Sequence, residues 1–301
     1  MGFHTENKSF TFNRHEKANE TGTWRGKIYL ALAAKVGIAL GAVLLVFFEI
    51  IPFLWIVLMS FKKKIDIFEL PPTLIFSPTL DNYYNAFVDG PFGQYLINSL
   101  IIDLPSTVLS ISAGTLTAYA FSRFKIFGEK HLFFYFLTTR MCPPIVVVLP
   151  LFVMFSKMNL YDTYLGMIFI HTVFNLALIV WLMKGFFDEI PVEINQAAAL
   201  DGYSEWATFL KFVLPLARPG IVVCALFCLV FSWNEFLFAQ VLTQFNAVTL
   251  PAGIPSLVTS RGTYWGQVAA VAVVITLPVF IFSVGFHKYL IRGLTFGAVK
   301  T

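Results

Sequence analysis

Charged residues are scarce in this chain of 301 residues. Only 13% are Asp, Glu, Lys or Arg, about half the share found in an ordinary soluble domain, so a soluble fold would have too few charges for its surface. Cysteine is scarce too: Cys142, Cys224 and Cys228 all lie inside apolar runs, which is typical of small buried side chains. No Cys/His spacing typical of a zinc site is present. A soluble protein and a disulfide-stabilised domain are therefore disfavoured.

Motifs for catalysis and energy coupling are also absent. The sequence lacks the G-x-x-x-x-G-K-[ST] loop, so the chain cannot by itself bind ATP in the Walker manner. Its five histidines (His4, His15, His131, His171 and His287) are spread along the chain without a paired nucleophile, which disfavours a membrane-embedded enzyme. An ion-coupled secondary transporter stays the alternative, although its acids are single and scattered rather than paired around broken helices.

Long apolar runs dominate what is present. The chain is 57% hydrophobic, with 34 Phe, 6 Trp and a mean hydropathy of +0.75. Stretches of this kind cross about 30 Å of hydrocarbon as helices, so the sequence predicts an all-α integral membrane protein. The first 27 residues are polar and basic, and no small-residue cleavage site follows, so we expect the first span to be an uncleaved anchor. The predicted spans are residues 36–61, 95–121, 131–155, 164–187, 220–242 and 268–290.

The distribution of basic residues predicts the orientation. With a cytoplasmic N-terminus, 14 Lys and Arg residues lie inside and 5 outside, and the other 2 of the 21 lie in or beside spans. This bias favours two cytoplasmic termini, although the run Lys62 to Lys64 goes against it. The basic residues behind the net charge of +4 are dispersed over the edges of the segments. They form no continuous basic stripe, which excludes a nucleic-acid-binding surface. The predicted organisation is a cytoplasmic segment 1–35, a first span 36–61, a periplasmic segment 62–94, a five-helix core 95–290 containing a cytoplasmic loop 188–219, and a cytoplasmic tail 291–301.

The predicted cytoplasmic loop contains two helix patterns. Pro191 suits the first position of a helix, and Gly202 suits the left-handed residue after its end, which gives a helix of about eleven residues. Ser204 then offers an N-cap for a second, amphipathic helix that ends before Pro215. Two short helices of this kind could dock onto a separate cytoplasmic protein or lie on the membrane surface with Trp206 in the headgroups. The pattern alone leaves both open.

Sequence motifs then identify a family. The run from Glu193 to Gly202 (EINQAAALDG), followed by Leu214-Pro215-Leu216, resembles the EAA loop of binding-protein-dependent ABC importers, and the chain from about residue 50 to 301 resembles the smaller permease of maltose-type carbohydrate transporters. Further matching motifs are Asn98-Ser99-Leu100, Ala118-Tyr119-Ala120-Phe121-Ser122-Arg123-Phe124, Met141-Cys142-Pro143-Pro144, Gly185-Phe186-Phe187, Ser232-Trp233-Asn234-Glu235-Phe236 and the tail from Arg292 to Lys300.

This resemblance implies a type I importer fold and a set of partners. These are a second permease, two ATPase subunits that bind ATP and Mg, and an extracytoplasmic solute-binding protein, which together carry a sugar inward. The chain itself would hold no cofactor or metal. Segment 243–267 would reach the binding protein, and the first span would wrap the partner permease. The residues implied in ATPase contact are Glu193, Gln196, Ala197, Ala198, Asp201, Gly202, Leu214 and Pro215 in the loop, and Gly297, Ala298, Val299 and Lys300 in the tail.

Two positions depart from the family pattern. Gln196 stands where the family usually has a Glu, and Phe212 stands where a small aliphatic residue is common. Gln keeps its hydrogen-bonding capacity but carries no charge, so Glu193 and Asp201 become the better candidates for polar contacts with the ATPase.

Polar residues inside the spans are the last candidates. Glu49, Asp103, Arg140, His171 and Glu235 lie within predicted spans, where charges usually face protein or water. They either line a translocation path or pair statically to hold the bundle together. The candidates for the path or for substrate contact are Asn98, Asp103, Arg140, Trp233, Asn234 and Glu235.

Overall fold

The computed structural model describes residues 14–260 and 262–295, and most of them are helical. Contacts divide the chain into two units, residues 1–55 and 56–301, and each is described here by itself. The first unit contains most of α1 (Arg14–Ser60), whose residues 34–55 are all exposed. The stretch Ala34–Ser60 has a mean hydropathy of 2.6 and is long and apolar enough to span a membrane.

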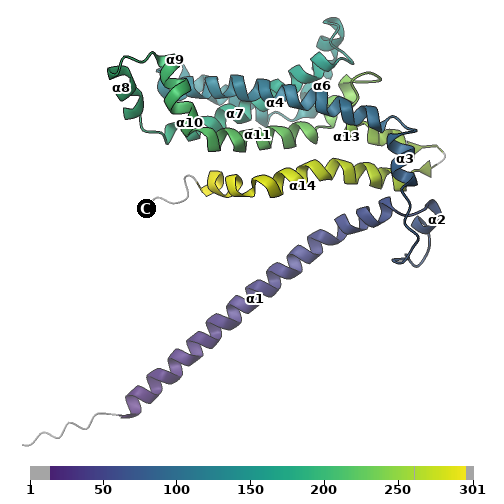
Figure 1. The fold of residues 1–301 in the computed structure, drawn as a ribbon, viewed down its shortest axis with the longest axis horizontal. Coiled ribbons are helices and arrows are strands. Elements are labelled where there is room, and N and C mark those ends of the chain that lie inside the picture. Colours follow the sequence, from purple (N-terminus) through teal and green to yellow (C-terminus); the bar gives the residue numbers. More distant parts are fainter. Residues whose placement is uncertain (1–13, 261, 296–301) are drawn as a thin grey trace, which may run out of the picture. The chain divides into compact units, whose positions relative to one another are not determined.

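The second unit is a helical bundle. Helices α4, α7, α11 and α14 run alongside one another, with α8 and α9 at one end and α3 and α13 at the other (Figure 1). Its elements are α2 (Lys64–Ile67), α3 (Asp81–Phe87), α4 (Phe92–Arg123), α5 (Glu129–Met141), α6 (Pro144–Lys157), α7 (Tyr164–Asp188), α8 (Glu193–Leu200), α9 (Glu205–Thr208), η1 (Phe209–Val213), α10 (Leu214–Leu216), α11 (Arg218–Trp233), α12 (Leu237–Leu242), α13 (Leu250–Gly253), η2 (Ile254–Leu257), β1 (Val258–Thr259), β2 (Gly262–Thr263) and α14 (Trp265–Thr295).

The predicted all-α membrane class is confirmed. In the described part of the chain, four helices are long and apolar enough to cross a membrane, and six spans result if each of two bent helix pairs counts as one. The strands β1 and β2 form a two-residue antiparallel hairpin. The segment that follows the first span is irregular with the short helices α2 and α3, in keeping with its many turn-forming residues.

Small residues let α4 and α7 pack closely. Ser106, Ser110, Gly114 and Ala118 recur every four residues along α4, and all four are buried. A Cβ added at Gly114 would lie 2.6 Å from Cγ2 of Ile179 in α7, so only glycine fits there. Such small-residue stripes are the usual way for membrane helices to approach one another, because lipid offers no hydrophobic driving force. The α4/α7 pair forms the centre of the bundle.

Two of the predicted spans are not continuous helices. The stretch 131–155 divides into α5 and α6, which meet at 95°. Pro143 and Pro144 follow the end of α5, and since neither has an N–H to continue its hydrogen-bond ladder, the chain turns there. The stretch 220–242 also breaks: α11 ends at Trp233, three non-helical residues follow, and α12 begins at Leu237. Both breaks place backbone turns next to polar side chains of the bundle interior.

The two-helix loop exists with shifted bounds. Helix α8 covers eight residues and begins at Glu193, so Pro191 is not its first residue. Gly202 has φ of +83°, which confirms the left-handed end, and the Ser204 hydroxyl accepts a hydrogen bond from the Ala207 amide, which confirms the N-cap. The second helix continues past Pro215, which lies in the first turn of α10 where its missing N–H is tolerated. The buried Cys224 and Cys228 in α11 are free thiols, as expected of small core residues.

Candidate functional site

The loop between α7 and α11 is fastened to the end of α4 by Arg123. Its Nη2 donates to the carbonyl of Ile190 at 2.7 Å, and its Nε donates to Oδ1 of Asn195 in α8 at 3.2 Å. Asn195 Nδ2 in turn donates to the hydroxyl of Tyr119, which lies one turn earlier in α4, at 2.8 Å. Hydrogen bonds from a guanidinium are stronger than those between neutral groups. These hydrogen bonds join α8 and the start of the loop to α4.

A second set of contacts joins the end of α4 to the end of α7. The Ser122 hydroxyl donates to Oδ1 of Asp188 at 2.6 Å, and Oδ2 of Asp188 pairs with Lys184 at 2.8 Å. Phe209, which belongs to the loop itself, is buried, and its ring centroid lies 4.6 Å from that of Tyr119 in α4. This aromatic contact is an apolar attachment of the loop to α4 beside the hydrogen bonds of Arg123 and Asn195.

One side of α8 is exposed. Glu193, Gln196, Ala197, Asp201 and Gly202 are all exposed. Leu200 is 89% exposed at the tip, whereas Ala198 is 4% exposed and packs inward. Apart from Ala198, the candidate residues of α8 and its C-terminal end thus form one exposed face. The candidates Leu214 and Pro215, further along the loop, are half-buried. The exposed side of α8 therefore presents small and polar side chains with Leu200 at its tip.

At the opposite end, Asp162 organises the segment after α12. This residue adopts φ of +54° between α6 and α7, and its carboxylate accepts hydrogen bonds from the amides of Gln244, Phe245, Asn246 and Ala247 at 3.0–3.2 Å. Partial burial acts to raise the pKa of Asp162, but the four amides together hold it below its ordinary value. No local pattern predicted this residue, because its partners lie about 80 positions away in the sequence.

Asn98 holds the same segment from the other side. It is fully buried in α4, and its Nδ2 donates to the carbonyls of Asn246 and Val248 at 3.0 and 2.9 Å. Its Oδ1 accepts from the hydroxyl of Tyr164 at 2.8 Å, and Ser99 accepts from the amide of Leu250. All the hydrogen-bonding capacity of the Asn98 amide is used by the protein. Asn98, which was predicted to line the translocation path, therefore holds the segment after α12 in place.

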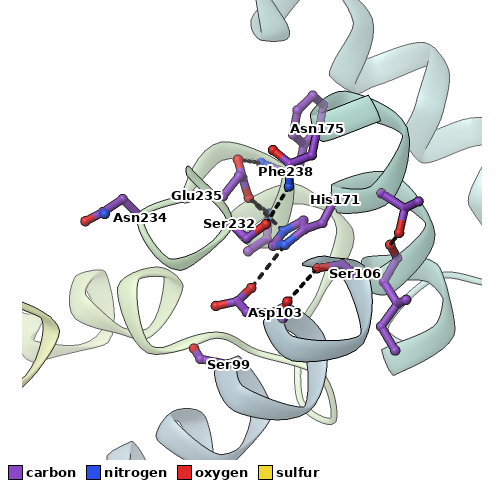
Figure 2. Close-up of polar contacts among 12 residues, drawn as sticks. Ser99, Asp103, Ser106, His171, Asn175, Ser232, Asn234, Glu235 and Phe238 are labelled. Atoms are coloured by element: carbon purple, nitrogen blue, oxygen red, sulfur yellow. Dashed lines mark hydrogen bonds and ion pairs between the residues drawn. The ribbon is translucent and has the colours of Figure 1, made fainter. Parts of the chain in front are cut away.

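A buried polar cluster joins three elements inside the bundle. His171 of α7 lies between two carboxylates: its Nδ1 is 3.2 Å from Oδ1 of Asp103 in α4, and its Nε2 is 3.7 Å from Oε2 of Glu235 (Figure 2). Asp103 and His171 are nearly fully buried. One turn further along α7, Asn175 donates to the Ser232 hydroxyl of α11 at 2.7 Å. Burial of this many polar groups is costly unless they are paired or face a ligand or water.

Glu235 also explains why the fifth stretch breaks. One carboxylate oxygen accepts from the amide of Phe238 at 2.7 Å, and the other accepts from the amide of Ala239 at 3.0 Å. These amides begin α12 and have no partner within the helix, so Glu235 stabilises a helix start at this depth. Its side chain is 19% exposed and faces a cavity of about 180 Å³ that His171 also lines.

Arg140 lines this cavity from the last turn of α5. Within residues 14–260 and 262–295 it has no carboxylate partner, and its guanidinium carbon lies 4.5 Å from the ring centroid of Phe231. The structure thus brings together Asp103, Arg140 and Glu235 of the predicted path residues, and it adds His171, Asn175 and Ser232 to them.

The other predicted residues lie elsewhere. Trp233 is buried and donates from Nε1 to the carbonyl of Ile275 in α14 at 2.9 Å. Asn234 is exposed and points away from the polar cluster (Figure 2). Glu49 is an exposed residue of α1. The tail residues Gly297 to Lys300 lie outside the described residues.

Comparison with known proteins agrees with this arrangement. Residues 106–296 match the family described as binding-protein-dependent transport system inner membrane component. The trehalose transport system permease protein SugB of Mycobacterium tuberculosis is 36% identical, covering 85% of this chain and 94% of that protein. The trehalose/maltose transport system permease protein MalG of Thermococcus litoralis is 33% identical, covering 88% of this chain and 97% of that protein.

A solved structure has the same fold. A chain of a bacterial ABC transporter involved in the import of the acidic polysaccharide alginate superposes with a TM-score of 0.71 at 22% identity, covering 85% of this chain and 96% of the other. With four to six candidate membrane spans in the described residues, an anchored two-helix loop and a family match over most of its length, this chain belongs to the family of inner membrane components of binding-protein-dependent transport systems.

Proposed function

We propose that this chain is a permease subunit of an ATP-driven importer and moves a sugar or sugar derivative into the cytoplasm by alternating access. The observation that carries the proposal is the exposed face of α8, which Arg123 and Asn195 fasten to α4. The named functions of the relatives, trehalose and maltose transport, support a sugar as the cargo. The chain would be non-catalytic.

Two ATPase subunits are the partners that this loop fits. In the proposed complex, the knob around Leu200 sits in a cleft of one ATPase subunit, and Glu193, Gln196 and Asp201 make polar contacts at its edge. Closure of the ATPase pair around ATP then moves α8, and the hydrogen bonds of Arg123 and Asn195 carry the motion to α4. ATP and Mg would be held by the ATPase subunits, and the tail Gly297 to Lys300 would also reach them.

This assignment fixes the orientation that we propose. The end of the bundle that carries α8 faces the cytoplasm of a bacterial inner membrane, and both termini lie on that side. The bias of 14 basic residues against 5 supports it. The exposed apolar surface of α1 would then be covered by a second, different permease subunit.

The opposite end would meet the extracytoplasmic binding protein. There the α2/α3 segment and the residues after the β1/β2 hairpin line a pocket of about 210 Å³ with aromatic and amide side chains, among them Phe68, Asn85, Trp265 and Gln267. The hairpin adjoins this pocket, since Thr263 of β2 also lines it. We assign this surface to docking of the binding protein.

Reconstitution tests the proposal. The full complex, purified from a host that co-expresses both permeases and the ATPase, is placed in proteoliposomes, and accumulation of radiolabelled sugars is measured with the binding protein present. We expect uptake with ATP and no uptake with a non-hydrolysable ATP analogue. Uptake driven by a proton or sodium gradient without ATP would contradict the proposal and favour a secondary transporter.

A further inference from the structure

The turn that joins α4 to α5 presents an exposed phenylalanine at its tip. The amide of Glu129 donates to the carbonyl of Ile126 at 3.1 Å, which leaves Phe127 and Gly128 as the central residues of a tight turn. Gly128 has φ of +72°, a left-handed value that glycine adopts without strain. The side chain of Phe127 is 101% exposed, the highest value among the large apolar side chains of the described residues. A lone exposed ring is ordinary on a soluble surface, so its meaning depends on what surrounds the turn.

The membrane surrounds this turn. Helix α4 is a candidate membrane span, and α5 begins another one together with α6. Only residues 124–128 lie between α4 and α5. Five residues reach at most about 17 Å when fully extended, and this segment is folded into a turn, so it stays close to the level at which the two helices enter the bilayer. Phe127 is therefore placed at the boundary between water and lipid, where apolar rings are buried among the headgroups.

Aromatic contacts hold both ends of the turn in place. The ring centroid of Phe121, in the last turn of α4, lies 5.9 Å from that of Phe133 and 6.0 Å from that of Phe136 in α5. Phe124, the first residue after α4, meets the ring of Tyr119 edge-on at 6.0 Å. Tyr119 is also the residue whose hydroxyl accepts a hydrogen bond from α8. The turn is thus a fixed surface that adjoins the contact between α4 and α8.

The charged residues of the turn make this surface positive. Lys125 and Lys130 are exposed and form no ion pair in the part of the chain that the structure describes. Glu129, the one acid among residues 124–131, lies in the first turn of α5, where the helix dipole stabilises a carboxylate. Two lysines against one glutamate give this stretch a formal charge of +1 with His131 neutral. Ammonium groups beside an apolar ring match the phosphate and the acyl chains of an anionic lipid.

We propose that the α4/α5 turn is a binding site for anionic phospholipid, in which Lys125 and Lys130 contact the headgroup phosphate and the ring of Phe127 enters the adjoining acyl-chain region. With the proposed orientation, this lipid belongs to the cytoplasmic leaflet. It holds the end of α4 at the membrane surface, beside the hydrogen bonds between α4 and α8. The proposal concerns the membrane and not the cargo, so it does not depend on which solute the protein carries.

Two protein partners compete with lipid for this surface. The ATPase subunits are proposed to dock on the exposed side of α8, whereas the short turn stays near the bilayer. The second permease would pack against membrane helices through small residues, and Gly128 is the only small residue among residues 124–131. Depth, charge and composition therefore favour lipid over either protein.

Photocrosslinking identifies what covers Phe127. The variant Phe127→p-benzoylphenylalanine keeps an aromatic ring, and the full complex is irradiated in nanodiscs of phosphatidylglycerol and phosphatidylethanolamine in equal amounts. We expect adducts with the mass of a phospholipid. Adducts with an ATPase subunit or the second permease, or no adduct at all, would overturn the proposal. The same probe at Leu200 should crosslink to the ATPase, and its failure to do so would count against the proposed function alone.

The lysines are tested through the choice of lipid. Each lysine variant is combined with the probe at position 127, and the ratio of phosphatidylglycerol to phosphatidylethanolamine adducts is measured by mass spectrometry. We expect Lys125→Gln and Lys130→Gln each to lower this ratio about fivefold, because each removes one cation from the anionic surface. Lys125→Arg and Lys130→Arg retain the charge and should retain the ratio.

A control variant separates local from overall charge. Lys211→Gln removes one positive charge from the loop between α7 and α11, where Nζ of Lys211 lies 5.0 Å from the ring centroid of Tyr203, and it should leave the ratio unchanged. If the ratio stays the same when Lys125 and Lys130 are both replaced by Gln, the lipid is held without its charge and the headgroup site is refuted. An equal fall in the Lys211→Gln variant would refute it as well, since the effect would then come from net charge.

Discussion

The amide oxygen Oδ1 of Asn195 in α8 lies 3.2 Å from Nε of Arg123 at the end of α4. This contact joins the exposed loop to the most buried helix pair of the bundle, because α4 packs along α7 through its small residues. This hydrogen bond and the one from Asn195 to Tyr119 join α8 itself to α4, beside the bond from Arg123 to the carbonyl of Ile190, and they are the contacts through which we propose that α8 moves α4.

Replacement of Asn195 tests this transmission. Asn195→Ala removes both hydrogen bonds, and loss of a hydrogen bond to a charged group costs about 1.5–3 kcal/mol. We expect ATP-driven uptake to fall at least about tenfold while the complex still assembles, since the exposed face of α8 is unchanged. Uptake and ATPase activity are measured together. Ser112→Ala, at an exposed position of α4, serves as the control, and normal coupled uptake by Asn195→Ala would show that the loop does not act through this bond.

Gly202 provides a separate test of the shape of the loop. Its φ of +83° is strained for any L-residue, and a β-branched side chain there costs roughly 1–2 kcal/mol or more. Because no atom lies within 4 Å of the added Cβ, Gly202→Val acts on the backbone rather than on packing. We expect loss of ATPase assembly and uptake with membrane insertion intact, as judged by co-purification. Gly185→Ala in α7, also with open space around it, should be tolerated.

The α4/α7 contact predicts a compensating pair. Gly114→Val places new atoms where Cγ2 of Ile179 lies, and overpacking of this kind costs about 1–3 kcal/mol. We expect a lower thermal stability of the purified complex and its partial recovery when Ile179→Ala creates the missing space. Equal destabilisation with and without the second substitution would mean that the two helices do not touch at this point.

Asp162 predicts a dependence on acid. Because its folded-state pKa is lowered, the carboxylate stabilises the protein above about pH 4, the ordinary range of an aspartate, and this contribution is lost as the pH falls through the lowered value. Asp162→Asn should lower the midpoint of thermal unfolding near neutral pH, and the difference from the wild type should shrink in acid. The exposed Asp89→Asn is the control. A difference that stays constant down to pH 2 would contradict the role of the ionised carboxylate.

Several features were predictable because they depend on local chemistry. The six apolar stretches follow from length and hydropathy, and the N-cap Ser204 and the left-handed Gly202 follow from residue type and spacing. The break at Pro143 and Pro144 also has a local cause, although the apolar run through it predicted one span. Locally encoded features of this kind need no knowledge of distant partners.

The path residues show the limit of such reasoning. Asn98, Trp233 and Asn234 were candidates because they are polar or aromatic inside a span. In the structure, however, Asn98 binds the carbonyl of Val248 and holds the segment after α12, and Trp233 donates a hydrogen bond to α14. His171 was among the span residues that either line a path or pair statically, but the sequence did not say with which partner. Ser232 appeared only within a family motif, and Asn175 was not singled out. Which of these side chains share a cavity depends on how α4, α7 and α11 pack, and the spacing within one helix carries no such information.

The sequence by itself determined that this protein is a multi-span membrane helix bundle, where its two-helix loop lies, and to which family it belongs, because apolar length, basic residues and the EINQAAALDG motif are read without tertiary contacts. The tertiary structure alone decided that Arg123 fastens the loop to α4, that Asp162 gathers amides from the far end of the chain, and that Arg140, His171 and Glu235 share one cavity. These contacts join residues separated by about 30–95 positions, and only the packed helices bring them within hydrogen-bonding distance or onto one cavity wall.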